Sequence, residues 1–298
     1  MKYNIKKEFG IFRKFTPPVN KLFLYISRCF MPIFSIKMKY SKKLDIKCYK
    51  INCSDKKKIK LYLIRPKNVK EALPVIFDIH GGGFIFKSSP HHIDLAKEYA
   101  LKTMKAVIYP DYRLAYNTTF GTTFSDCLDS YKFILNNADF LKIDTNKIDI
   151  IGDSAGGYLA LLLMKQIHTL SLAMPHSQLL IYPVVDPTMS TNSMKKYTNT
   201  PMWNAKCNVK MWEYYSKGNE VYNPLLDDLS FMPNSYIETT EYDCLRDEGK
   251  ILYTKLEQSD VNCKIYETTG TMHGYDIKQK APTTLKSKEI RIKFLLEK

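Results

Sequence analysis

The chain lacks the features of a disulfide-rich, zinc-binding or membrane-spanning protein. Its seven cysteines are scattered and odd in number, with no CxxC pair and no Cys/His cluster at zinc-ligand spacing. Free, mostly structural thiols in a reducing, cytoplasmic compartment are therefore expected. No apolar run reaches the roughly 20 residues of a membrane-spanning helix. Internal repeats and low-complexity tracts are also missing, which argues against a solenoid or a long disordered region.

Acidic side chains are in short supply. Lys and Arg number 45 against 30 Asp and Glu, which gives the 298 residues a net charge of +15. Such a charge can attract nucleic acid, an anionic membrane or an acidic substrate. Lysines recur throughout, with one concentration before residue 60, so we interpret the charge as a basic surface and predict no nucleic-acid partner. The length and the ordinary hydrophobic fraction of 45% predict one globular domain with a single large core.

Residues 21–36 (KLFLYISRCFMPIFSI) form an apolar, aromatic segment that Arg28 and Pro32 interrupt. It is too short for a membrane span, and no small-residue cleavage site follows it as in a signal peptide. Two interpretations remain open. One is a helix lying on a membrane surface, and the other, which we favour, is a lid helix over an active site. The membrane interpretation draws on nearby basic residues: Lys2, Lys6, Lys7, Arg13 and Lys14.

From residue 44 onward, strand patterns alternate with helix patterns. Residues 44–53 and 59–65 predict two antiparallel strands. Buried strands are then predicted at 74–80, 106–110, 147–152, 177–183, 234–242 and 263–269. Helices are predicted at 91–104, 123–137, 155–168, 246–258 and 282–297. This order predicts an α/β fold, a mostly parallel sheet with helices on both faces, whose functional residues lie at the carboxyl ends of the strands.

The strongest motif is GDSAGG at residues 152–157, a G-x-S-x-G between a predicted buried strand and a predicted helix. A nucleophile elbow requires this setting, because a sharp turn there holds the serine, here Ser154, in a strained conformation. The glycines leave room for the strand and helix to approach, and the helix N-terminus offers backbone N–H groups. The alternative is a glycine-rich turn with an incidental serine.

A second glycine motif, HGGGF at residues 80–84, lies at the end of the strand predicted at 74–80. Ester hydrolysis passes through a tetrahedral oxyanion, and removing one donor to it typically costs about 10²–10³ in turnover. Glycines let backbone N–H groups converge on that oxygen. Alone, the three glycines could form a flexible turn, but two glycine motifs at neighbouring strand ends favour a shared function.

A serine nucleophile needs a base, and the chain has six histidines. His273 alone follows both glycine motifs and lies in a loop after a strand, in TGTMHGY. The others are interpreted as structural or surface residues: His80, His91, His92, His168 and His176.

The acid that orients the base should lie between the serine and His273, in a loop after a strand. Asp243, immediately after the strand predicted at 234–242, meets both conditions. The competing carboxylates fall inside the next helix (Asp247, Glu248) or before the strand (Asp227, Asp228). The resulting order Ser154, Asp243, His273 is that of the α/β-hydrolases.

Together these motifs resemble those of the bacterial hormone-sensitive-lipase-like esterases. HGGGF (80–84), DYRLA (111–115), GDSAGGYLA (152–160), YDCLRDEG (242–249) and HGY (273–275) occur in the family's order, over about residues 45–297. The resemblance implies an α/β-hydrolase fold with a helical cap and hydrolysis of carboxylic esters, commonly of short acyl chains, without metal or cofactor. It also implies that the backbone N–H groups of Gly82, Gly83 and Ala155 form the oxyanion hole.

The chain departs from the family at YRLAYNTTFGTTF, which lacks the usual Pro-Glu run, and at Cys244, where proline is usual. Both departures bear on substrate preference. Segments 1–44 and 187–222 match the family's cap by position only. We therefore predict an N-terminal cap or lid segment at 1–44 and a catalytic domain at 45–298 with a cap insertion around 187–222. The aromatic part of the insertion either lines an acyl pocket or is plain helix packing: Met202, Trp203, Met211, Trp212 and Tyr215.

The sequence thus predicts a serine carboxylesterase for a small-molecule ester of short to medium acyl chain, with Ser154 as nucleophile, His273 as base and Asp243 as orienting acid. One alternative is a ligand-binding protein of this fold, which the presence of both His273 and Asp243 disfavours. A small-amide hydrolase and a membrane-surface lipase are the others. The natural ester and the oligomeric state, a homo-oligomer included, stay open.

Overall fold

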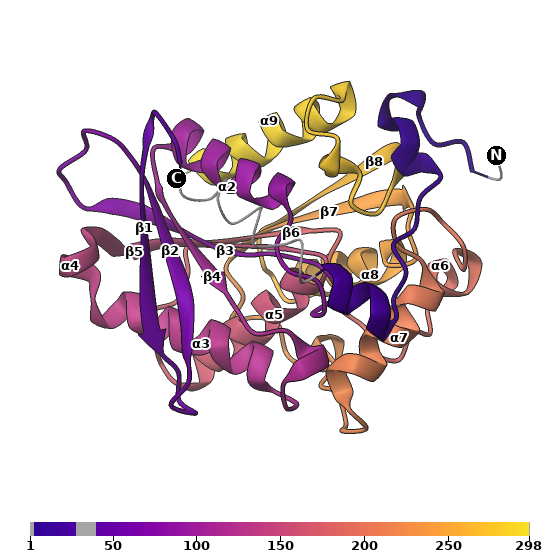
Figure 1. Cartoon of the computed structure of the whole chain (residues 1–298), viewed down its shortest axis with the longest axis horizontal. Coiled ribbons are helices and arrows are strands. Elements are labelled where there is room, and N and C mark those ends of the chain that lie inside the picture. The colour runs from indigo at the N-terminus through magenta and orange to yellow at the C-terminus, as the bar shows by residue number, and fades with distance from the viewer. Residues whose placement is uncertain (1–2, 28–39, 298) are drawn as a thin grey trace.

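An eight-stranded sheet forms the centre of the molecule, in the order β1-β2-β4-β3-β5-β6-β7-β8 (Figure 1). The computed structural model describes residues 3–27 and 40–297. The β1–β2 and β2–β4 pairs are antiparallel, and every pair from β4 to β8 is parallel. The strands are β1 (Leu44–Asn52), β2 (Lys58–Pro66), β3 (Leu73–Ile79), β4 (Ala106–Asp111), β5 (Ile143–Asp153), β6 (Ser177–Ile181), β7 (Asn234–Tyr242) and β8 (Cys263–Met272).

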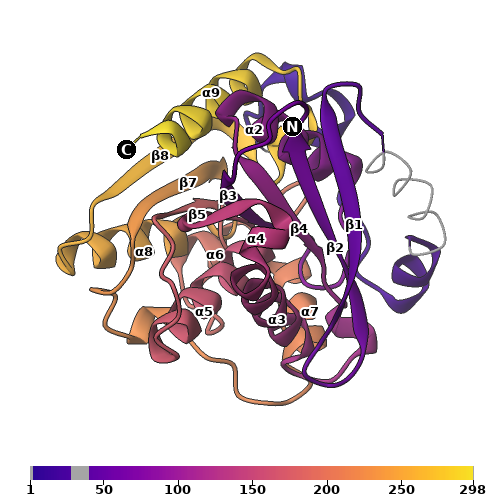
Figure 2. The same cartoon turned by 90° about the vertical axis from the view of Figure 1, so that its left-hand side faces the viewer.

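Helices cover both faces of this sheet, as the alternating pattern predicts. Figures 1 and 2 show α2 (Pro90–Thr103) and α9 (Pro282–Leu296) on one face. On the other face lie α3 (Thr122–Asn136), α5 (Ala155–Thr169) and α8 (Arg246–Gln258). Shorter elements are η1 (Lys7–Arg13), η2 (Ala115–Asn117), α4 (Ala138–Leu141), α6 (Asn192–Lys196), α7 (Ala205–Ser216), η3 (Pro224–Leu226) and η4 (Tyr275–Ile277). The predicted α/β architecture is therefore confirmed.

The central strands are continuous apolar runs because both of their faces are covered. In β3, Val75 and Phe77 belong to the core on one side of the sheet, and Ile76 belongs to the core on the other. Side chains alternate between the two faces of a strand, so a single short run such as PVIFDI supplies both cores. The two layers of helices are held to the sheet in this way.

The N-terminal segment packs against the rest of the chain. Residues 21–27 are helical, Leu24 is buried in the main core, and Phe23 makes an edge contact with Phe86 at 6.1 Å between ring centroids. Residues 28–36 of the predicted apolar segment lie outside the described residues. Within the described part of the chain, no helix combines the length and apolar character needed to cross a membrane.

A buried ion cluster ties α9 to the carboxyl end of the sheet. Arg291, fully buried on α9, donates two hydrogen bonds to the Glu238 carboxylate, at 2.9 and 2.6 Å, and a third to Asp276 at 2.9 Å. Burial opposes the charge, but the facing Glu238 holds the pKa of Arg291 well above its usual range. Tyr275 and Tyr182 complete the cluster, donating to Glu238 and Asp276 respectively at 2.6 Å.

Replacing Arg291 with Met is expected to lower the free energy of unfolding by about 3–5 kcal/mol, because two carboxylates stay buried without their partner. Arg291→Lys is expected to fall in between, since a lysine cannot donate the paired bonds that Glu238 receives. Urea unfolding measures both. Lys286→Ala, on the exposed side of the same helix, serves as the control and is expected to change stability by less than about 0.5 kcal/mol. A loss for Arg291→Met no larger than that of the control would contradict the assignment.

Candidate active site

Ser154 stands alone between the end of β5 and the start of α5, in a backbone conformation that non-glycine residues rarely adopt (φ 53°, ψ −120°). The neighbouring glycines allow this turn. A Cβ on Gly156 would lie 1.9 Å from the carbonyl oxygen of Ile79, and one on Gly152 would lie 2.4 Å from that of Gly156. The predicted strand, turn and helix around the serine are therefore present.

The three residues predicted as nucleophile, base and acid lie in contact. The Ser154 Oγ is 2.8 Å from Nε2 of His273, and Nδ1 of His273 is 2.7 Å from Oδ2 of Asp243. The serine and histidine are nearly buried, and Asp243 is completely buried. They come from three different places: the β5–α5 turn, the loop after β7 and the loop after β8.

Asp243 is itself held on both oxygens. Thr240 donates its hydroxyl to Oδ2 at 3.0 Å, and the backbone N–H of Leu245 donates to Oδ1 at 3.0 Å. These bonds give both oxygens of a buried side chain a partner, and burying polar atoms without partners would be costly. The carboxylate is thus fixed where its Oδ2 can accept a hydrogen bond from a protonated Nδ1 of His273. That tautomer leaves Nε2 free to accept the serine proton.

The glycine loop after β3 turns back beside the serine. Gly82 and Gly83 have positive φ angles of 110° and 59°, and the Gly82 carbonyl accepts the N–H groups of Ile85 and Phe86. In the described part of the chain, the backbone N–H groups of Gly82, Gly83 and Ala155 donate no hydrogen bond. Unpaired N–H groups of this kind, with Ala155 at the start of a helix, suit an incoming anion.

Two residues that the sequence did not single out hold this loop in place. Asp153, directly before the serine, accepts the backbone N–H of Gly81 at 2.8 Å and contacts Nε2 of His92 at 3.2 Å. Burial disfavours a charged His92, but the Asp153 carboxylate raises its pKa above the usual value, and His92 in turn lowers that of Asp153. The two side chains therefore form a hydrogen-bonded pair behind the glycine loop, in which each favours the charged form of the other. Its one sequence signal is that Asp153 belongs to the GDSAGG motif.

The remaining candidates lie elsewhere. His80 is buried, stacks on Tyr112 at 4.2 Å between ring centroids, and burial lowers its pKa to about 3. Of the rejected carboxylates, Asp247 accepts the N–H of Ser193 and Glu248 that of Val185, so both hold loops. Asp227 pairs with Lys165. Across residues 3–27 and 40–297, no group of three or more His, Cys, Asp or Glu side chains is arranged to hold a metal ion.

The cap insertion lies over the glycine loop. Trp203 contacts Gly83 so closely that a Cβ there would lie 2.7 Å from its ring, and its ring centroid is 6.2 Å from that of His273. The Met211 side chain also lies over Gly83, because a Cβ there would be 3.4 Å from its Cγ. Trp212 and Tyr215 instead pack with Phe84 and Tyr158 in an aromatic cluster. Of the two interpretations of this segment, a pocket lining fits Trp203, and helix packing fits Trp212 and Tyr215.

A family model and several known proteins that resemble this chain all belong to one family. A family model described as alpha/beta hydrolase fold matches residues 76–277. An arylesterase from Saccharolobus solfataricus is 31% identical over 215 residues, which cover 67% of this chain and 68% of the relative. An ethyl acetate hydrolase from Pseudomonas putida is 29% identical over 222 residues, 72% of this chain and 70% of the relative.

Among solved structures, a bacterial heroin esterase superposes with a TM-score of 0.87 at 25% identity, over 98% of this chain and 97% of its own. The match therefore extends over nearly the whole chain, whereas the family model starts in β3. The motifs, the sheet order and these matches agree, and the chain belongs to the α/β-hydrolase family of hormone-sensitive-lipase-like esterases.

Proposed function

We propose that the chain hydrolyses carboxylic esters through an acyl-enzyme, with Ser154 as nucleophile, His273 as general base and Asp243 as the orienting acid. The observation that carries the proposal is the continuous hydrogen-bonded relay from Ser154 Oγ through the imidazole to the buried Asp243 carboxylate, at 2.8 and 2.7 Å. Nucleophile and base within hydrogen-bond reach, with a third group orienting the base, are the geometric requirements of this chemistry.

In the proposed reaction, the Ser154 oxygen attacks the ester carbonyl carbon as its proton passes to Nε2 of His273. The carbonyl oxygen becomes an oxyanion that the N–H groups of Gly82, Gly83 and Ala155 stabilise. The intermediate collapses, the alcohol takes the proton from His273, and the acyl group stays on the serine. Water then repeats the sequence, releasing the acid and restoring the serine.

Asp153 acts in this proposal as a positioning residue for the oxyanion hole. Its carboxylate receives Gly81 N–H, one residue before the first proposed donor, Gly82. Asp153 directly precedes Ser154 in the chain, and its side chain is bonded to the glycine loop. This one residue therefore holds the serine and the glycine donors at a fixed separation. Preorganised donors matter because a displaced donor loses most of its effect on the transition state.

We further propose that the acyl group is short. The Trp203 ring lies against Gly83 and near His273, and Ser154 is itself buried, so we expect Trp203 to limit the space open to an acyl group. The P. putida relative bears the name of an ethyl acetate hydrolase, which agrees with a small acyl pocket. Small amides are the second candidate, because the same relay could attack them. A reducing, cytoplasmic setting also stays part of the proposal, since the described cysteines are all free.

Ser154→Ala is expected to abolish hydrolysis of p-nitrophenyl acetate. Asp243→Asn is expected to lower kcat by about 10⁴, because the asparagine amide donates to Nδ1 and holds His273 in the tautomer whose Nε2 cannot accept the serine proton. Both variants are expected to keep the unfolding temperature of the parent closely enough to show that they are folded. The measurement is steady-state hydrolysis of p-nitrophenyl esters from acetate to palmitate. A folded parent that cleaves no ester in this series would favour the ligand-binding alternative, and an active Ser154→Ala would contradict the assignment of the nucleophile.

Asp153→Ala is expected to lower kcat by about 10–100-fold with little change in KM, because Gly81 N–H loses its acceptor and the oxyanion donors shift. Asp153→Asn is the matched variant: its amide oxygen can still accept Gly81 N–H, so most of kcat is expected to return. His92→Gln removes the imidazole that contacts Asp153 and leaves the hydrogen bond from Gly81 N–H in place, so it tests the two contacts of Asp153 separately. Equal losses in the Ala and Asn variants would show that the charge, and not the bond to the loop, is what matters.

Trp203→Ala is expected to shift the preference toward longer acyl chains, raising the ratio of kcat/KM for octanoate over acetate at least about tenfold as space opens beside Ser154. Trp212→Ala is the control, since that ring packs with Phe84 and Tyr158, away from the imidazole. It is expected to lower stability and leave the ratio unchanged. An unchanged ratio in Trp203→Ala would remove this residue from the acyl pocket.

A further inference from the structure

Most of the excess positive charge is concentrated in one short stretch of the chain. Residues 1–43 contain eleven Lys and Arg and a single acidic residue, Glu8, so they carry +10 of the total +15. Glu8 is already engaged, accepting the N–H of Thr283 at 3.0 Å. The remainder of the chain is close to balanced. A charge that merely kept the protein soluble would not need this concentration.

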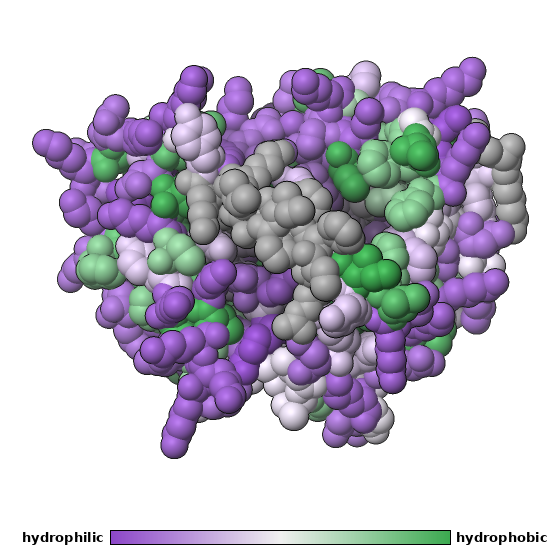
Figure 3. Space-filling model, viewed as in Figure 1, coloured by the Kyte–Doolittle hydropathy of each residue, from purple (hydrophilic) through white to green (hydrophobic). Residues whose placement is uncertain are grey.

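The same stretch exposes large apolar side chains. Leu22, Tyr25 and Ile26 lie three and four positions apart on the helix of residues 21–27, which places them on one side of it, and they are 42–70% exposed. Ile11 in η1 is 74% exposed, and Phe15 is 44% exposed. In Figure 3, hydrophobic side chains gather on the right of the face over η1 and this helix, among hydrophilic ones. We call these five side chains and the basic residues Lys7, Arg13, Lys14 and Lys21 the N-terminal face.

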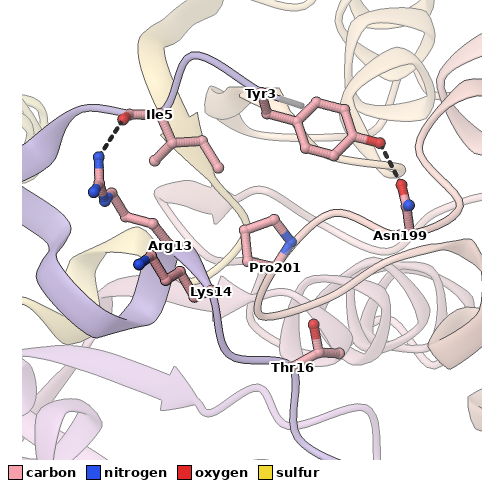
Figure 4. A pocket seen from close by; sticks show the side chains of 7 residues that line it. All are labelled: Tyr3, Ile5, Arg13, Lys14, Thr16, Asn199 and Pro201. Atoms are coloured by element: carbon pink, nitrogen blue, oxygen red, sulfur yellow. Dashed lines mark hydrogen bonds between the residues drawn. The ribbon is translucent and has the colours of Figure 1, made fainter. Parts of the chain in front are cut away.

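A cleft of about 230 Å³ opens within this face, between η1 and the cap insertion (Figure 4). Arg13, Lys14 and Thr16 line it on one side, and Asn199 and Pro201 on the other, with no acidic residue. The Arg13 guanidinium donates one bond, to the Ile5 carbonyl at 3.3 Å, and its Nε–H has no partner in the described part of the chain. That Nε is buried, so it is the positive charge of Arg13 and Lys14 along a cleft without acidic residues that suits the oxygens of an anionic headgroup.

We propose that the N-terminal face docks the enzyme onto an anionic lipid bilayer. The exposed apolar side chains enter the boundary between headgroups and acyl chains, and the basic residues contact phosphate groups, which is the arrangement of membrane-surface helices. Nucleic acid would use the charge but not the apolar side chains. A second copy of this chain would place like charges against one another. The bilayer is the partner that uses both features.

The N-terminal face borders the proposed active site. The carbonyl of Phe15 accepts the N–H of Met202 at 2.7 Å, and Trp203, the next residue, lies against the glycine loop. On its inner side the same segment is fixed by buried Val19 and Leu24. Docking would therefore bring the cap of the enzyme to the membrane without unpacking it. Because docking is a matter of binding, it can be tested apart from hydrolysis.

The test is co-sedimentation of the full chain with phosphatidylcholine vesicles, with and without one quarter phosphatidylglycerol. We expect binding to the anionic vesicles that weakens as salt rises, and at least about tenfold weaker binding to neutral vesicles. Arg13→Gln with Lys14→Gln, and separately Leu22→Ser with Tyr25→Ser, are each expected to weaken binding about tenfold or more. Vesicle binding equal for neutral and anionic lipid, or absent from both, would overturn the proposal.

Matched controls carry the same chemistry on other surfaces. Lys57→Gln with Lys58→Gln removes two exposed charges where the β1–β2 turn meets β2, and Phe140→Ser with Leu226→Ser removes two exposed apolar side chains. Neither pair is expected to change vesicle binding. Losses of binding equal to those of the N-terminal variants would overturn the proposal, because total charge or total exposed apolar area would then be responsible.

A fluorescence change that appears only on binding distinguishes a lost contact from a misfolded variant. Tyr25→Trp is expected to shift its fluorescence to the blue on adding anionic vesicles, whereas Leu226→Trp is not. The two native tryptophans, Trp203 and Trp212, are buried and supply a constant background. No shift in Tyr25→Trp would overturn the proposed contact. A shift on adding inorganic phosphate alone would assign the cleft to a free anion and overturn the membrane as its partner.

Discussion

The site depends on one close approach, in which the start of α5 presses against the end of β3 with no side chain between them. Gly156 makes this approach possible, because any Cβ there would collide with the Ile79 carbonyl. Ile79 is followed at once by the glycine loop, and Gly156 follows the nucleophile by two residues. A single contact therefore sets the spacing between Ser154 and the two proposed glycine donors, Gly82 and Gly83, which lie some seventy residues away in the chain. Asp153 then fixes the same spacing from the other side by accepting Gly81 N–H.

The other half of the site depends on a different kind of interaction. His273 lies in the loop after β8, and its ring meets the edge of Tyr182 at 4.7 Å between centroids. Tyr182 is in turn bonded to Asp276, which Arg291 holds from α9. The buried charge cluster thus positions the loop that carries the base, while glycine contacts position the nucleophile. An ion cluster of this kind is costly to bury, and its place beneath the histidine loop gives a physical reason for keeping it there.

Sequence reasoning predicted the elements of the sheet within a few residues, because each parallel strand is an unbroken apolar run and each helix has its own period. It selected Ser154, Asp243 and His273 from their positions after strands, and the structure brings these three together. It missed the Asp153–His92 pair. His92 looks like the first turn of a helix, and its contact with Asp153 joins residues 61 positions apart. That contact depends on how α2 packs on the sheet, which no local pattern records. The division of the cap aromatics, with Trp203 beside the site and Trp212 behind it, has the same origin.

For residues 21–27, the two interpretations of the N-terminal segment describe opposite sides of one element. A lid requires apolar side chains facing the protein, and Leu24 and Phe23 supply them. A membrane contact requires apolar side chains facing outward beside positive charge, and Leu22, Tyr25 and Lys21 supply these. Residues 21–27 are apolar at most positions, so a helical period cannot choose between the two sides, because both satisfy it. The packing of Leu24 and Phe23 against the protein decides which side of the segment is exposed. Exposing apolar side chains to water costs free energy, and an anionic membrane would remove that cost by burying them while its phosphates pair with the basic residues.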